Sequence, residues 1–163
     1  DIIDRGVSGE LAARAAERIK LEVALHEPNL VLWQVGTFDA MSQVPLLDFR
    51  HTLKKTIQWL RKHNADLVVV GLHYQRGLRT DDSYQAFRKI IEEITTQEKV
   101  LRIGRYEAEE LVDRLQSAAA SPVDKFQVTE NGYDCLSQFV VRVMATSLFA
   151  RKTLDGTIPL PKP

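Results

Sequence analysis

The stretch from Val31 to Asp39 constrains the fold of this 163-residue chain more than any other segment. It is a short apolar run that Gly36 interrupts and that Phe38 and Asp39 follow. An apolar run of this length that ends at a glycine is typical of a buried β-strand. In a parallel sheet, the residues after such a strand lie at its carboxyl end, where α/β proteins bind their ligands. Phe38 and Asp39 are therefore expected at a functional edge of the sheet.

Strand-like and helix-like segments alternate along the whole chain. Short apolar runs predict strands at residues 1–4, 30–35, 67–72 and 100–103. Apolar side chains at helical spacing predict helices that begin near Leu11, Pro45, Thr80 or Asp81, Ala108 and Glu130. This alternation predicts a three-layer α/β/α, flavodoxin-like fold with a parallel sheet, the first strand of which is expected upstream of this chain. Residues 1–150 would form the domain and residues 151–163 a proline-rich tail.

The composition argues against several classes of partner. Lys plus Arg and Asp plus Glu number 22 each, so no net charge attracts nucleic acid or an anionic membrane surface. No apolar run reaches the roughly 20 residues of a membrane span. The histidines and the single cysteine, Cys135, lack metal-ligand spacing, and no glycine-rich phosphate loop is present. We expect no nucleic-acid partner, membrane span, metal or cofactor, and the cellular compartment stays open.

Three short motifs lie where the carboxyl ends of strands would meet. They are Val7-Ser-Gly-Glu10, Gly36-Thr-Phe-Asp39, and Asp124-Lys-Phe-Gln127 followed by Asn131-Gly-Tyr133. In this order and on this alternation, they resemble the conserved blocks of the SGNH hydrolases, also called the GDSL-like esterases and lipases. The resemblance extends from Asp1 to about Ala150. It implies an esterase fold that acts on acyl or acetyl esters.

The resemblance also implies roles for individual residues. Gly9 takes the place of the family's oxyanion-hole glycine, and Phe38 stands where the family has an oxyanion-hole asparagine. Asp124 takes the place of the catalytic acid, and Gln127 stands where the family has its histidine base. The family's first block, which supplies the nucleophilic serine, has no counterpart in this chain. The sequence is therefore a divergent relative that lacks the serine block.

Both substitutions remove chemistry that ester hydrolysis needs. The phenyl ring of Phe38 has no N–H group for a developing oxyanion, and loss of one such donor costs roughly 10²–10³ in rate. The amide of Gln127 does not titrate near neutral pH, so it cannot relay a proton. Without a histidine to orient, Asp124 becomes a loop hydrogen-bonding residue, and Asp39 is expected to tie down its own loop. The leading hypothesis is a degenerate hydrolase that serves as a binding or structural module.

Two alternatives remain. Ser8, Gly36, Asp39 and His73 are further candidates for the pocket, and His73 follows an apolar strand at the expected edge. The chain could therefore be an active esterase, or a carbohydrate acyl-ester hydrolase, with a serine upstream of Asp1 and His73 as its base. It could also be an interaction domain of a longer polypeptide. The expected ligand is an acylated carbohydrate or a small ester, or else a protein partner.

Overall fold

The computed structural model describes residues 1–118, 137–138, 140–142 and 145. The chain divides into two compact units, Asp1–Glu110 and Leu111–Pro163. The first unit contains the strands and the candidate site that follow. Of the second unit, the structure describes the end of a helix that runs to Ala118 and a few further helical residues. The predicted site residues Asp124 and Gln127, the proline-rich tail and Cys135 lie outside the described residues.

The first unit is built on a parallel sheet of three strands in the order β1-β2-β3. The strands are β1 (Leu30–Gln34), β2 (Asp66–Val70) and β3 (Leu101–Ile103). Trp33 lies opposite Val69 between the first two strands, and Val70 lies opposite Ile103 between the last two. Because all pairs are parallel and the order follows the sequence, the carboxyl ends of all three strands meet at one edge. The predicted parallel sheet is confirmed.

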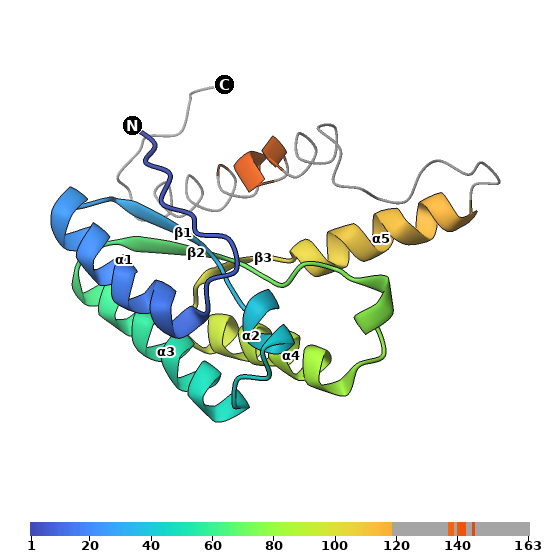
Figure 1. Ribbon diagram of the computed structural model, residues 1–163. Helices are drawn as coiled ribbons and strands as arrows, with labels where there is room; N and C mark the ends of the chain where they lie inside the picture. Colours follow the sequence, from blue (N-terminus) through green and yellow to red (C-terminus); the bar gives the residue numbers. More distant parts are fainter. Residues whose placement is uncertain (119–136, 139, 143–144, 146–163) are drawn as a thin grey trace, which may run out of the picture. The chain divides into compact units, whose positions relative to one another are not determined.

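Helices alternate with the strands along the chain. They are α1 (Ala12–His26), α2 (Thr37–Met41), α3 (Leu46–Lys62), α4 (Asp82–Gln97) and α5 (Arg105–Ala118), with a 3₁₀ turn at Arg76–Leu78. Figure 1 shows α1, α3 and α4 on the same face, and the core lies between them and the sheet. Phe49 of α3 and Phe87 of α4 meet there, with ring centroids 4.8 Å apart. No helix in the described part of the chain is both long and apolar enough to cross a membrane.

The helix boundaries follow local sequence. Asp81 caps α4 by accepting a hydrogen bond from the backbone N–H of Tyr84 at 2.7 Å, which settles the choice between residues 80 and 81. α3 begins directly after Pro45, as the sequence predicted. α1 ends at His26, and the next residue, Glu27, takes a left-handed conformation before Pro28.

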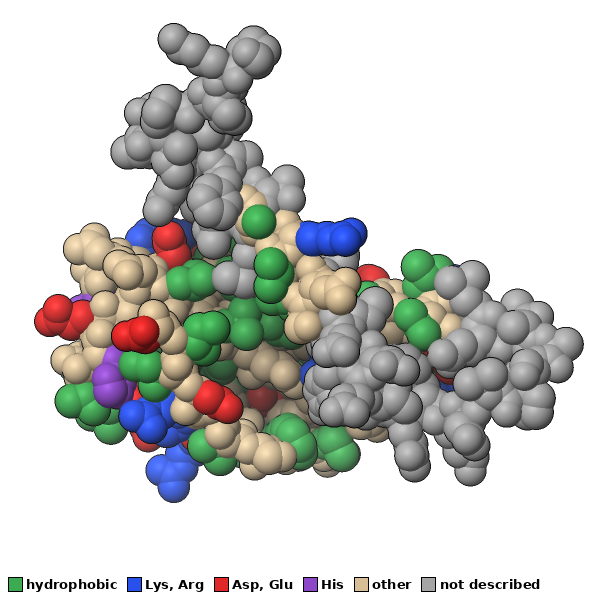
Figure 2. All heavy atoms as spheres, turned by 90° about the horizontal axis from the view of Figure 1, so that it is seen from above, with side chains coloured by type: hydrophobic (Ala, Val, Ile, Leu, Met, Phe, Trp, Pro, Cys, Tyr) green, Lys and Arg blue, Asp and Glu red, His purple; other side chains and the backbone are tan. Residues whose placement is uncertain are grey.

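On the opposite face of the sheet, β1 is less buried than its apolar sequence predicts. Val68 and Val69 of β2 are fully buried, so the central strand is covered on both faces. On β1, Trp33 is buried but Leu32 is 54% exposed. Figure 2, which views the molecule from that side, shows hydrophobic side chains at the surface of the described part. The uniform apolar run of β1 thus reflects a strand with one packed face and one partly open face.

The expected strand at residues 1–4 is wrong. This segment has no regular secondary structure, and Ile2 is fully exposed. Two isoleucines favour extended backbone, but a strand also needs a neighbour to complete its hydrogen bonds, and no described strand pairs with this segment. The sequence also missed α2, because five residues are too few to show helical periodicity.

Gly36 ends β1 and begins α2 in a conformation that only glycine accepts readily. Its φ is 103°, and a Cβ atom there would lie 2.8 Å from Cδ1 of Ile91 and 2.9 Å from Cδ1 of Leu72. The side chains of Ile91 and Leu72 pack directly against the backbone of Gly36. This packing fixes the direction in which the chain leaves the sheet.

Replacement of Gly36 by alanine should therefore lower the free energy of unfolding by about 2–4 kcal/mol, because strain at positive φ adds to overpacking. Urea denaturation of wild type and variant measures the change. Gly77→Ala is the matched control, since nothing lies within 4 Å of its Cβ position. Equal effects of the two substitutions would contradict the proposed packing constraint.

Candidate active site

Two loops meet at the carboxyl end of β1. A Cβ atom on Gly9 would lie 3.8 Å from Cε1 of Phe38, so the Phe38 ring lies against the Gly9 loop. The Phe38 side chain is 41% exposed. A hollow of about 30 Å³, room for little more than one water molecule, is lined by residues 34–38 and Glu10. The structure thus brings together the two positions that the resemblance assigns to the oxyanion hole, and one of them carries an apolar ring.

Asp39 holds these two loops together. It is 1% exposed, and its Oδ1 accepts a hydrogen bond from the backbone N–H of Ala12, the first residue of α1, at 2.9 Å. The N–H groups of Asp39 itself and of Gly36 also bond to this carboxyl group. Burial raises the pKa of Asp39, and the three N–H donors offset part of that rise. Asp39 does tie down its own loop, but it also caps a helix that begins 27 residues earlier.

His73 lies beyond the carboxyl end of β2, beside α2. Its backbone N–H donates to Oγ1 of Thr37 at 3.0 Å, and its carbonyl oxygen accepts from the Tyr84 hydroxyl at 2.5 Å. Burial raises the pKa of Tyr84, which keeps this hydroxyl protonated and able to donate. The main chain at His73 is therefore held from both sides, next to the segment that carries Phe38.

The imidazole of His73 contacts a buried carboxylate. Its Nδ1 lies 2.7 Å from Oε2 of Glu109, and the same oxygen accepts from the backbone N–H of Tyr74 at 2.6 Å. The other oxygen of Glu109 accepts from Nε of Arg105 at 2.7 Å. Burial alone would raise the pKa of Glu109, but His73, Tyr74 and Arg105 outweigh it and hold that pKa below its ordinary value. Glu109 is therefore an ionised carboxylate at neutral pH.

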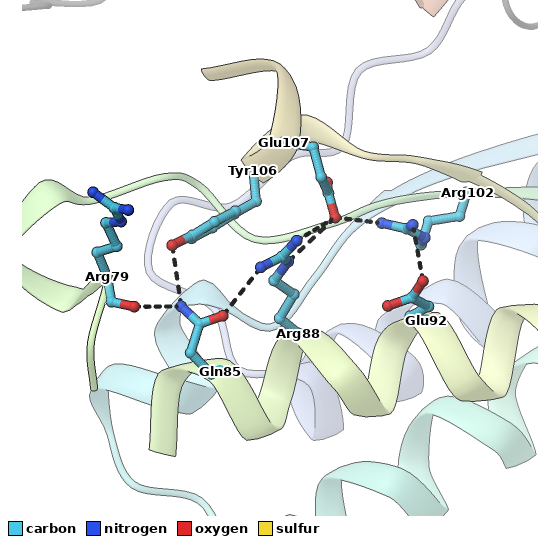
Figure 3. A network of polar contacts seen from close by, with 7 residues as sticks. All are labelled: Arg79, Gln85, Arg88, Glu92, Arg102, Tyr106 and Glu107. Atoms are coloured by element: carbon cyan, nitrogen blue, oxygen red, sulfur yellow. Dashed lines mark hydrogen bonds and ion pairs between the residues drawn. The ribbon is translucent and has the colours of Figure 1, made fainter. Parts of the chain in front are cut away.

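A polar network fixes the first turn of α5, directly before Glu109. Glu107 receives hydrogen bonds from Arg88 and Arg102, each at 3.2 Å. The side-chain amide of Gln85 donates to the Tyr106 hydroxyl at 3.1 Å, and the Arg88 guanidinium lies 4.5 Å from the centre of the Tyr106 ring. Figure 3 shows these groups joining α4, β3 and the start of α5. By holding the start of α5, the network fixes the position of the Glu109 carboxylate.

Ser8, the other pocket candidate, shows no sign of a catalytic role in the structure. Ser8 is exposed in a turn and lacks the strand-to-helix elbow of an activated nucleophile. The sequence missed Glu109, Arg105 and Thr37. The spacing of Arg105 and Glu109 was the available signal, since residues four apart on a helix face the same side. Among the described residues, no group of three or more His, Cys, Asp or Glu side chains could hold a metal ion.

One family model and several solved structures match this chain. A model of the Non-GDSL lipase-like family matches residues 1–148. No curated protein matches the chain in sequence.

Solved structures share the fold at low identity. A catalytic mutant of Axe2, an acetylxylan esterase from Geobacillus stearothermophilus, superposes with a TM-score of 0.72 at 17% identity, over 87% of this chain and 71% of that one. A lipase/acylhydrolase from Enterococcus faecalis gives 0.65 at 19% identity, over 83% and 71%. The esterase EstA from Pseudoalteromonas sp. gives 0.57 at 18% identity, over 62% of this chain. The match spans only 55% of the length of EstA.

Asp39→Ala should lower the free energy of unfolding by about 2 kcal/mol, because the buried N–H groups of Ala12 and Gly36 lose their acceptor. Asp39→Asn keeps an oxygen for Ala12 and should lose less. Because the folded-state pKa of Asp39 is raised above its ordinary value of 3.8, the wild type should lose stability relative to Asp39→Asn as the pH rises through that folded-state pKa.

Urea denaturation at several pH values measures both effects. Asp48→Ala is the control, since Asp48 is likewise the third residue of its helix but is exposed. A loss as large for Asp48 as for Asp39 would refute the cross-loop role of Asp39.

Glu109→Gln should lower the free energy of unfolding by about 3 kcal/mol near neutral pH, because it leaves the buried Arg105 without a countercharge. The pKa of Glu109 is lowered, so its stabilising charge is fully present above the ordinary value of 4.5 and is lost as the pH falls through the lower folded-state value. The difference between wild type and variant should shrink over that acidic range in urea denaturation. Glu93→Gln, which breaks a half-exposed pair with Arg50, should leave stability almost unchanged.

Proposed function

The chain belongs to the Non-GDSL lipase-like family and is an SGNH hydrolase-type domain, and on that basis we propose that it binds an esterified ligand without hydrolysing it. The single observation that carries this proposal is the exposed Phe38 ring at the position that the resemblance assigns to the oxyanion hole. The ring is partly exposed at the carboxyl edge of the sheet and lies against the Gly9 loop. A fold can persist after its chemistry is gone, because function depends on a few side chains.

The Phe38 substitution favours binding over catalysis. An oxyanion hole works by donors that point at a developing negative charge, and a phenyl ring offers only an apolar surface. The same ring is suited to contact an acyl group or the face of a sugar. The ligand class that we propose is an acylated carbohydrate or a small ester, in keeping with the acetylxylan esterase Axe2 among the structures of the same fold. Gln127 in place of the family's histidine points in the same direction.

A second candidate is supported by one contact. His73 and Glu109 form a carboxylate–imidazole pair at the same edge, the arrangement that orients a histidine base in serine hydrolases. With a serine supplied upstream of Asp1, His73 could act as the base of an active esterase or carbohydrate acyl-ester hydrolase.

An assay of p-nitrophenyl acetate and acetylated xylo-oligosaccharides tests the proposal. We expect no turnover above the rate of free imidazole, and we expect Phe38→Asn combined with Gln127→His not to restore it in these 163 residues, because none of their motifs matches the family's serine block. The same assay should be repeated on the natural polypeptide.

Turnover well above background, abolished by a single substitution, would refute the binding proposal. If His73→Asn abolishes that turnover and the rate varies with pH between about 5 and 8, the second candidate holds. A flat profile over this range would count against a histidine base.

A further inference from the structure

One half of the His73 ring is buried and the other is accessible. Nδ1 is inaccessible to solvent and lies 2.7 Å from Oε2 of Glu109, a close contact that falls short of regular hydrogen-bond geometry, whereas the His73 side chain as a whole is 27% exposed. Part of the side chain is therefore open to solvent, and Nε2, unlike Nδ1, is not among the buried polar atoms that lack a hydrogen-bond partner in the described part of the chain. No hydrogen bond joins Nε2 to any residue in the described ranges. The side chain has one nitrogen committed inside the fold and one available at the surface.

The carboxylate decides which nitrogen carries the proton. Glu109 already accepts hydrogen bonds from Tyr74 and Arg105. Together with the contact to His73, these bonds favour the ionised form of Glu109. An ionised carboxylate can only accept hydrogen bonds. A ring nitrogen 2.7 Å away must therefore be protonated, and in the neutral imidazole the lone pair then lies on Nε2.

We propose that Glu109 is a positioning residue that fixes His73 in the Nδ1–H tautomer, so that Nε2 accepts a hydrogen bond from a hydroxyl group at the carboxyl edge of the sheet. The ligand class is a hydroxyl-bearing molecule, such as the alcohol or sugar part of an ester. The proposal deepens the proposed function and rests on it for the identity of that molecule. Carboxylates fix the tautomer and raise the basicity of histidines in this way at metal and catalytic sites.

The position of His73 places this acceptor at the candidate site. Its backbone N–H bonds to Thr37, the residue before Phe38. The Tyr84 hydroxyl holds its carbonyl oxygen, and the network in Figure 3 holds the turn of α5 from which Glu109 reaches in. The acceptor is therefore set by rigid elements rather than by a free side chain.

Ring ¹⁵N chemical shifts of the wild-type protein, recorded near pH 8 where free imidazoles are neutral, test the tautomer directly. His63 is the internal reference, because its Nδ1 lies 2.8 Å from the carbonyl oxygen of Trp59, which can only accept a hydrogen bond. We expect His73 and His63 to show the same pattern, with the proton on Nδ1. A proton on Nε2 of His73 overturns the proposal.

Modification by diethyl pyrocarbonate, followed by peptide mass spectrometry, tests whether Nε2 is available and whether Glu109 activates it. We expect His73 to react in the wild type, and Glu109→Gln to slow that reaction roughly threefold or more while His63 reacts as before. If the glutamine variant does not fold, Glu109→Asp keeps the charge but withdraws it from Nδ1. An unreactive His73, or equal rates in wild type and variant, overturns the proposal. Neither measurement needs ester turnover. The outcome of the esterase assay above therefore does not affect the test of the His73 tautomer.

Discussion

The buried carboxyl group of Asp39 is the interaction on which the candidate site depends most. It joins the start of α1 to the start of α2, so the loop with Gly9 and the helix with Phe38 are held as one piece. Gly36 adds a steric constraint at the same point, since close side chains leave no space for a Cβ atom. The fold therefore holds together the two positions that the resemblance assigns to the oxyanion hole. Such a scaffold can stay intact whether or not its chemistry is kept, because function depends on a few side chains.

A second buried carboxylate organises the end of β2. Glu109 reaches from α5 to the backbone of Tyr74 and to the ring of His73, with Arg105 as its countercharge. Removing one partner of such a buried ion pair is costly, because the other charge is left unpaired, yet the whole pair adds little net stability over apolar packing. Its specific effect is orientation: it determines which edge of the His73 ring is buried. The two strand ends are thus held by polar anchors rather than by the hydrophobic core alone.

The sequence predicted the central elements well, because their patterns are long and local. The run at residues 67–72 gave β2, and the apolar stripe after Asp81 gave α4. It failed where distant partners decide the structure: residues 1–4 resemble a strand but find no neighbour, and Glu109 contacts His73 from another element. The roles of the candidate site residues remain predictions, and Asp124 and Gln127 lie outside the described residues.

The anchoring of β2 from α5 affects where a functional unit of this fold can be cut. A chain shortened after Ile103 would keep every described strand and the helices α1 to α4. It would nevertheless lose Arg105 and Glu109, and with them the groups that orient His73. A chain that keeps the whole described sheet is therefore still too short to present the complete site. Evolution or engineering that recombines this module has to carry α5 at least as far as Glu109 along with the sheet.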